Sequence, residues 1–233
     1  MRVSILGLAA LLAAQAAFAD TTSYTGTLAS PEDFYTVTVT MPVDGTMGLQ
    51  TWGFGGGTNA ASQLIPAGGF DSFVGVFAGT GPTATYIDGA SDSLTSFPYG
   101  IGCPPAGTVN IGGGAVCGDI TLAESLTAGT YTVLLSDAGY IPAAVFETSG
   151  ELGDGFYDFT GGAFQTCNTV GNNITCANDT ANWALDITTP AAPEAPSVVP
   201  EPGELWAFGL LLFLCNETVR RRLAATIPFK FKI

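Results

Sequence analysis

Hydrophobic and polar residues alternate along several short segments of this chain. In residues 34–41, Tyr35, Val37, Val39 and Met41 would share one face of a strand, with threonines on the other. This two-residue period with β-branched side chains is typical of a strand buried on one side. Four further segments show similar patterns, at residues 47–52, 70–77, 131–135 and 183–188. We therefore predict an all-β fold, a single β-sandwich or jelly-roll domain over residues 20–189.

The charge distribution restricts what this domain can do. The chain has six basic residues and no histidine, and all six basic residues lie outside residues 20–199, whereas seventeen of the twenty acidic residues lie inside. Without basic side chains to neutralise phosphate, we expect no nucleic-acid partner. Catalysis that depends on histidine or lysine is also excluded, which leaves paired carboxylates or a metal held by oxygen ligands. We therefore predict that the protein is not an enzyme.

The N-terminus has the features of an export signal. Arg2 supplies a positive charge, residues 3–14 form an apolar core, and Ala17 and Ala19 place small residues at the two positions that signal peptidase recognises. The sequence therefore predicts a secretory signal peptide over residues 1–19, cut after Ala19.

A second signal lies near the C-terminus, after a proline-rich linker at residues 190–202. A Pro-Glu-Pro motif, an apolar segment at residues 205–215 and three arginines follow one another there. The motif is Pro200, Glu201 and Pro202, and the arginines are Arg220, Arg221 and Arg222. This order resembles the PEP-CTERM sorting signal of Gram-negative bacteria over residues 199–222. The resemblance implies recognition and cleavage by an exosortase, a membrane enzyme.

The apolar segment itself predicts a marginal membrane anchor. Its eleven residues are fewer than the roughly 20 that span the hydrocarbon core, so a short transmembrane helix must include residues 216–219. The arginines that follow favour a cytoplasmic tail at residues 223–233.

Four cysteines lie in the predicted domain and fit an oxidising compartment. Four cysteines permit three pairings, and the shortest loops are closed by pairing neighbours. We expect the pairs Cys103 with Cys117 and Cys167 with Cys176. Zinc binding is disfavoured because the spacing lacks Cys-x2-Cys knuckles.

Two glycine-containing segments predict turns. In Leu126-Thr-Ala-Gly129, Gly129 can adopt positive φ before a strand begins, and Asp88-Gly89 is a hairpin-type pair. Asp71 follows two glycines and can cap its own turn. The carboxylates of Asp71, Asp88 and Asp92 can alternatively supply oxygen ligands to calcium, so we expect no cofactor other than a possible calcium ion.

The order of strands and turns over residues 23–189 is similar to an exported bacterial domain family related to the pre-peptidase C-terminal (PPC) β-sandwich. The features shared are a Gly-Phe-Asp at residues 69–71, an acidic turn near Asp88, and Leu-x-Ala-Gly-x-Tyr at residues 126–131. The resemblance implies a β-sandwich carried by proteins with a PEP-CTERM signal.

We expect an exported protein that is first anchored in the membrane and then found at the cell surface or in the extracellular matrix, with a structural or adhesive role. Its expected partners are an exosortase, the membrane and extracellular polysaccharide. A calcium- or glycan-binding module is the alternative, and a carboxylate-based hydrolase is a third reading, which requires two acids facing each other in a cleft.

Overall fold

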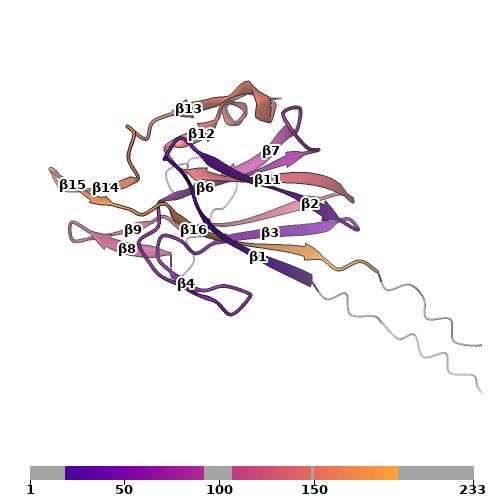
Figure 1. Cartoon of the computed structure of the whole chain (residues 1–233), viewed down its shortest axis with the longest axis horizontal. Coiled ribbons are helices and arrows are strands. Elements are labelled where there is room, and N and C mark those ends of the chain that lie inside the picture. The colour runs from indigo at the N-terminus through magenta and orange to yellow at the C-terminus, as the bar shows by residue number, and fades with distance from the viewer. Residues whose placement is uncertain (1–18, 92–106, 148–149, 194–233) are drawn as a thin grey trace, which may run out of the picture. The chain divides into compact units, whose positions relative to one another are not determined.

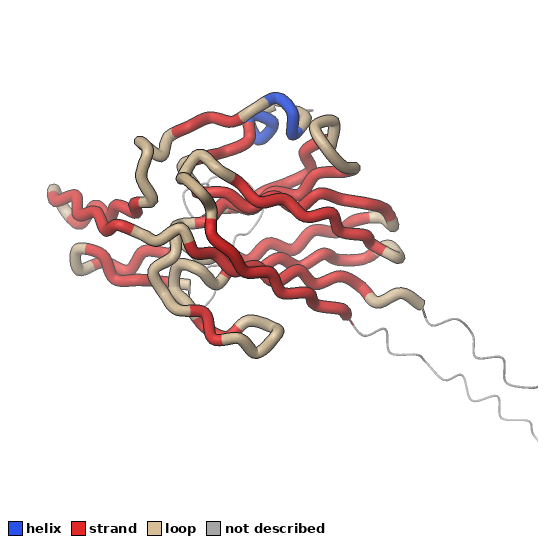
Figure 2. The backbone as a smooth tube through the Cα atoms, in the orientation of Figure 1, coloured by secondary structure: helices blue, strands red, loops and turns tan. Residues whose placement is uncertain are grey.

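The computed structural model describes residues 19–91, 107–147 and 150–193, and strands dominate this part of the chain (Figures 1 and 2). Two four-stranded antiparallel sheets form the body. Sheet A has the order β1 (Ala19–Thr27), β16 (Asn182–Pro190), β3 (Gly45–Thr51), β10 (Thr121–Leu126). Sheet B has the order β2 (Phe34–Met41), β11 (Gly129–Asp137), β6 (Ser72–Ala78), β7 (Thr85–Ala90). The all-β prediction is confirmed, and the paired sheets have the arrangement of a β-sandwich.

Smaller elements surround the two sheets. Four two-stranded ribbons are β4 (Gly57–Thr58) with β5 (Leu64–Ile65), β8 (Thr108–Ile111) with β9 (Gly114–Cys117), β12 (Tyr140–Pro142) with β13 (Phe156–Asp158), and β14 (Gln165–Val170) with β15 (Asn173–Asn178). Two 3-10 helices, η2 (Ala143–Phe146) and η3 (Leu152–Asp154), lie between β12 and β13 in the sequence.

The main core lies between the two sheets. Alternate residues of each strand face it, such as Met47 and Leu49 of β3 and Val74 and Val76 of β6, all of which are at most 3% exposed. This is the alternation that the sequence shows, because successive side chains of a strand point to opposite faces. Burial of such side chains removes apolar surface from water and stabilises the pair of sheets.

Sheet B is buried on its outer face as well. Phe73, Phe77 and Leu134 point away from the main core and pack in a second cluster against Ile141 of β12 and Ala144 of η2. The β12–β13 ribbon and the 3-10 helices therefore form a cover over sheet B, which is also where Figure 1 places them. Two-sided burial explains why β6 is apolar on both faces, unlike the half-polar β2.

Two cross-strand glycines make room for the aromatic rings of this outer cluster. Gly75 of β6 pairs with Gly89 of β7. A Cβ atom at Gly89 would lie 2.7 Å from Cζ of Phe73, and one at Gly75 would lie 3.1 Å from ring atoms of Phe73 and Phe77. Asp88-Gly89 is therefore the interior of a strand, and the prediction of a hairpin-type turn there is wrong.

The turn between β10 and β11 exists but differs in detail from the prediction. Gly129 is the first residue of β11 and is not among the glycines with positive φ. The turn is instead held by side chains: the Tyr131 hydroxyl donates to the Thr127 carbonyl at 2.8 Å, and the Ala128 N–H donates to Asp44 at 2.7 Å.

The first and last strands of the body are neighbours. β1 and β16 pair along their whole length, from Ala19 opposite Pro190 to Thr27 opposite Asn182. The described chain thus enters and leaves at adjacent positions of sheet A. In residues 19–91, 107–147 and 150–193, no helix is long and apolar enough to cross a membrane. The predicted signal peptide and C-terminal anchor lie outside these residues.

Candidate functional site

The predicted processing residues fall at or beyond the ends of the described chain. Ala19, the expected cleavage position, is the first residue of β1. The six residues of the sorting motif, Pro200, Glu201, Pro202, Arg220, Arg221 and Arg222, lie outside the described residues, as does the membrane segment between them.

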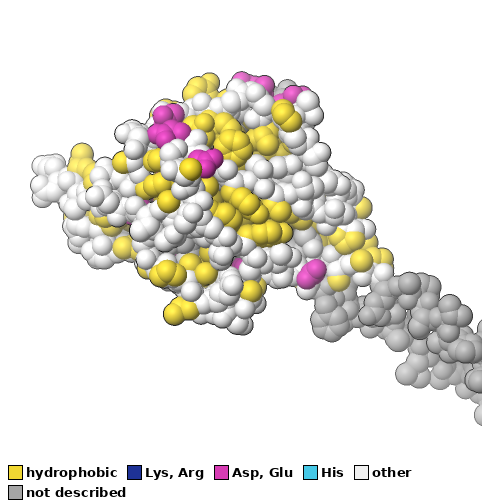
Figure 3. Space-filling view, in the orientation of Figure 1, with side chains coloured by type: hydrophobic (Ala, Val, Ile, Leu, Met, Phe, Trp, Pro, Cys, Tyr) yellow, Lys and Arg dark blue, Asp and Glu magenta, His cyan; other side chains and the backbone are white. Residues whose placement is uncertain are grey.

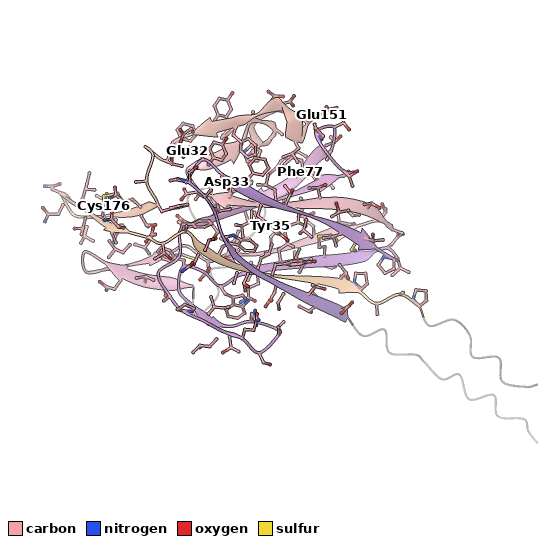
Figure 4. All side chains as sticks on the ribbon, in the orientation of Figure 1. Glu32, Asp33, Tyr35, Phe77, Glu151 and Cys176 are labelled. Carbon is pink, nitrogen blue, oxygen red and sulfur yellow. A yellow bond between two sulfur atoms is a disulfide. The ribbon has the colours of Figure 1, made fainter. Side chains whose placement is uncertain are left out.

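One of the two expected disulfides is confirmed. Cys167 and Cys176 face each other in the β14–β15 hairpin and are bonded. Figure 4 shows Cys176 on this hairpin, at the end of the body away from the described chain ends. Cys117 at the end of β9 is also disulfide-bonded, and its expected partner Cys103 lies outside the described residues.

The carboxylates expected to share a calcium ion are not brought together. Asp88 in β7 pairs with Val76 of β6, whereas Asp71 precedes β6, five residues and roughly 16 Å farther along that strand. Asp92 lies outside the described residues. Across the parts of the chain that the structure describes, no group of three or more histidine, cysteine or acidic residues is placed to hold a metal ion.

Asp88 instead faces a carboxyl group of the other sheet. Glu124 of β10 and Asp88 of β7 are hydrogen-bonded where these two edge strands approach each other. Burial, followed by the hydrogen bond and the charge of Asp88, raises the pKa of Glu124 to about 7. Asp88 is 7% exposed, its Oδ1 accepts from the N–H of Gly89, and its buried Oδ2 accepts no hydrogen bond from an N–H or hydroxyl group of the described residues. The two acids therefore meet where the edges of sheets A and B approach each other.

Asp71 lies beside a different acid, Asp137 at the end of β11. Both line a pocket of about 430 Å³, with Phe159, Thr160 and Thr166 on its wall. The pKa of Asp137 is raised to about 6, mainly by burial. The hydrogen bond that it accepts from the Gly139 N–H at 2.7 Å has the opposite effect and lowers the pKa. The surrounding acids raise the pKa further: Asp179, Glu32 and Asp158.

Aromatic side chains reach the surface next to this pocket. In β13 and the residue after it, Tyr157 and Phe159 are 48% and 68% exposed, and Phe146 at the end of η2 is 50% exposed. The ring centroids of Phe146 and Tyr157 are 5.3 Å apart, and those of Tyr157 and Phe159 are 6.3 Å apart. We call these three residues the aromatic run. It ends at the pocket, because Phe159 belongs to both.

A second pocket, of about 480 Å³, lies on the outer face of sheet A. There Asp186 of β16 accepts hydrogen bonds from the Trp52 indole N–H at 2.7 Å, the Ser23 hydroxyl at 2.5 Å and the Ala60 N–H at 2.8 Å. These bonds fix the β4–β5 loop on the sheet. Since the carboxylate is fully occupied by protein donors, its role is structural.

Asp119 has a similar structural role. It is completely buried, and it accepts the backbone N–H groups of Phe54 at 3.1 Å and Gly55 at 2.6 Å. Burial raises its pKa, while these hydrogen bonds act in the opposite direction. The carboxyl group therefore anchors the loop that follows β3.

Comparison with protein-family models and with curated proteins finds no match to this chain. Among the features described above, the aromatic run and the adjoining Asp137 pocket form the most distinctive candidate site. Sequence reasoning missed Asp137, Glu124 and Phe159. The two acids carry no local motif, whereas the alternation of Tyr157 and Phe159 along the chain was a usable signal.

Proposed function

We propose that the chain is an exported surface or extracellular-matrix protein with an adhesive, non-enzymatic role, sorted through the PEP-CTERM-like signal at residues 199–222. The domain would be released from its leader after Ala19 and held at the membrane by the C-terminal segment before an exosortase acts on Pro200, Glu201 and Pro202.

The observation that carries this proposal is the position of the folded body between the two signals. The strand β1 begins at the expected leader cleavage residue Ala19, and its partner β16 ends at Pro190, where the linker starts. Removal of residues 1–19 and of the C-terminal signal would therefore take only Ala19, the first residue of β1, from the two sheets. The Cys167–Cys176 disulfide agrees with an oxidising destination.

The geometry favours adhesion over a purely structural role because aromatic side chains are left in solvent. Exposed aromatic residues in mutual contact are typical of surfaces that meet a partner. The hydrolase reading receives less support: Asp71 and Asp137 line one pocket, but an oxygen of Asp137 is already used to bind the Gly139 backbone.

The sorting step is tested by intact mass and cell fractionation of the full chain in a bacterium that has an exosortase. The test variant changes Pro200, Glu201 and Pro202 to alanine. A matched control changes Pro193, Glu194 and Pro196, a similar set in the same linker. We expect the wild type and the control to be cut after Ala19 and near residue 199 and to leave the membrane, and the test variant to keep its C-terminus.

An uncut C-terminus in the wild type would contradict the sorting proposal. Equal processing of the test variant would contradict the assignment of Pro200, Glu201 and Pro202 as the recognised motif.

A further inference from the structure

The aromatic run is exposed because of how β13 is placed. Phe156 points to the inner side of the ribbon, where it stacks on Tyr140 with centroids 4.5 Å apart and on Phe34 at 4.7 Å. Tyr157, the next residue of β13, points the other way, and Phe159 follows directly after the strand. Figure 3 shows hydrophobic side chains gathered in the upper part of the view, where Figure 1 places β12 and β13, with acidic side chains beside them.

Three exposed aromatic rings in contact are unusual for a surface that meets only water. A phenyl or phenol ring has a large apolar face, and burial of that face is favourable. The rings of Tyr157 and Phe159 are nearly parallel, with 21° between their planes, and both are at least 48% exposed, so each leaves apolar surface open to solvent. A ligand with flat apolar faces would cover it.

The aromatic run continues into a cavity whose wall contains a hydrogen-bond acceptor, the carboxyl group of Asp137. Asp137 lines the cavity and is 8% exposed. Its Oδ1 accepts the Gly139 N–H, and its Oδ2 accepts no hydrogen bond from any described residue. An acceptor of this kind in the wall of a cavity can take a hydrogen bond from a ligand's donor group. The ligand therefore has hydroxyl or amide donors next to its apolar faces.

The charges around the cavity exclude an acidic ligand. Asp179, Glu32 and Asp158 are near enough to Asp137 to raise its pKa, and residues 20–193 contain no lysine, arginine or histidine. Figure 4 shows two acids of this region, Glu32 and Asp33, side by side between β1 and β2. Carboxylate, sulfate or phosphate groups on a ligand would be repelled there.

We propose that the aromatic run and the Asp137 cavity bind a polysaccharide that carries no acidic groups. Sugar rings supply both required features, apolar C–H faces for Tyr157 and Phe159 and hydroxyl donors for Asp137. The inference rests on the adhesive role proposed above and adds its ligand class. It does not depend on sorting, because binding is measured on the purified full chain whether or not the C-terminal signal is cut.

The test is retention of the full chain, purified in mild detergent, on suspended cellulose, chitin and β-1,3-glucan particles, with alginate beads as the acidic polysaccharide. We expect retention on at least one neutral polysaccharide and none on alginate. Phe159→Ala and Tyr157→Ala should each weaken the retained binding by about tenfold, the factor that loss of one stacked ring gives. Leu64→Ala, which removes an 82% exposed side chain of β5, should bind as the wild type does.

Because Phe159 and Tyr157 are exposed, their truncation should leave the thermal unfolding midpoint unchanged, so lost binding reports on the site. Absence of wild-type retention on all three neutral polysaccharides would overturn the proposal. Equal retention of Phe159→Ala and the wild type would also overturn it. Retention only on a phenyl-substituted resin, abolished by Tyr157→Ala, would show that the aromatic run binds apolar groups and would reject the sugar.

Discussion

Glu124 on β10 is hydrogen-bonded to Asp88 on β7, so two acidic side chains hold together the edges of two different sheets. Two carboxylates at this position would repel each other, so the proximity of Asp88 favours the protonated form of Glu124. Tyr86 lies on the same strand as Asp88, and its own pKa is raised by burial and by the charges of both acids.

The first prediction is that stability falls with rising pH through this pair. The pKa of Glu124 is raised to about 7 in the folded protein from 4.5, so the folded state binds the proton more tightly than the unfolded state. The contribution is complete below about pH 4.5 and is lost as the pH rises through 7. Asp137, with its pKa raised to about 6, acts in the same direction.

The measurement is the free energy of unfolding in urea at pH 5 and pH 8 for the wild type and Glu124→Gln. Glutamine keeps a hydrogen-bond donor to Asp88 but does not titrate, so the variant should lose less stability between the two pH values. An identical pH dependence in both proteins would show that titration of Glu124 does not contribute to the pH dependence of stability.

The second prediction concerns Asp119. Asp119→Ala leaves the buried backbone N–H groups of Phe54 and Gly55 without an acceptor, and the loss of such bonds costs about 1–3 kcal/mol. We expect denaturant unfolding to report a decrease of this size. Asp119→Asn should lose less because one oxygen remains, and Asp20→Ala, at an exposed acid, serves as the control. A normal stability of Asp119→Ala would contradict the role given to this carboxyl group.

A third prediction concerns the close packing at Gly89. The added methyl group of Gly89→Ala would lie 2.7 Å from Phe73 Cζ and 2.9 Å from the Val74 carbonyl oxygen. Overpacking of this kind costs about 1–3 kcal/mol, measurable as a lower midpoint of urea unfolding. Adding Phe73→Leu to this variant removes the clash with the ring and should restore part of the lost stability. The rescue should be incomplete because the close contact with the Val74 backbone remains. Gly48→Ala, whose nearest contact is 3.6 Å, is the matched strand control, and equal effects at Gly48 and Gly89 would refute the explanation.

The fourth prediction is that the Cys167–Cys176 bond stabilises its hairpin locally. Closing a loop of this length is worth roughly 2.7 kcal/mol in the chain-entropy model, and a two-stranded ribbon is marginally stable alone. In a variant with both cysteines changed to serine, amide hydrogen exchange should speed up across residues 165–178. Exchange at Leu185 in the centre of sheet A should stay slow. Acceleration of both would mean that the bond supports the whole body.

The main sheets could be predicted from the sequence because their pattern is local. Residues 34–41 alternate over their full length, and β2 has these bounds. The segments at residues 131–135 and 183–188 lie inside β11 and β16, which extend one or two residues beyond them at each end. The ends of a strand depend on the strand that pairs with it, and that partner strand lies far away in the sequence.

Other features escaped prediction because distant residues determine them. Asp88-Gly89 has the composition of a turn, but the ring of Phe73 across the strand pair requires Gly89 to lack a side chain. The partners Glu124 and Asp88 lie on strands of different sheets. Likewise, the alternation of Phe156 and Tyr157 does not tell which of the two is covered, since the covering residues Phe34 and Tyr140 come from elsewhere.

The pairing of β1 with β16 also sets an order for folding. The strand β16 lies between β1 and β3. Among the described strands it is the last to be synthesised, whereas all four strands of sheet B are complete by Asp137. Sheet B can therefore form before β16 is synthesised, whereas β1 cannot pair until β16 is present. Contacts so far apart in sequence form slowly. If the chain crosses a membrane through a pore with its N-terminus first, sheet A cannot be completed until nearly the whole domain has crossed.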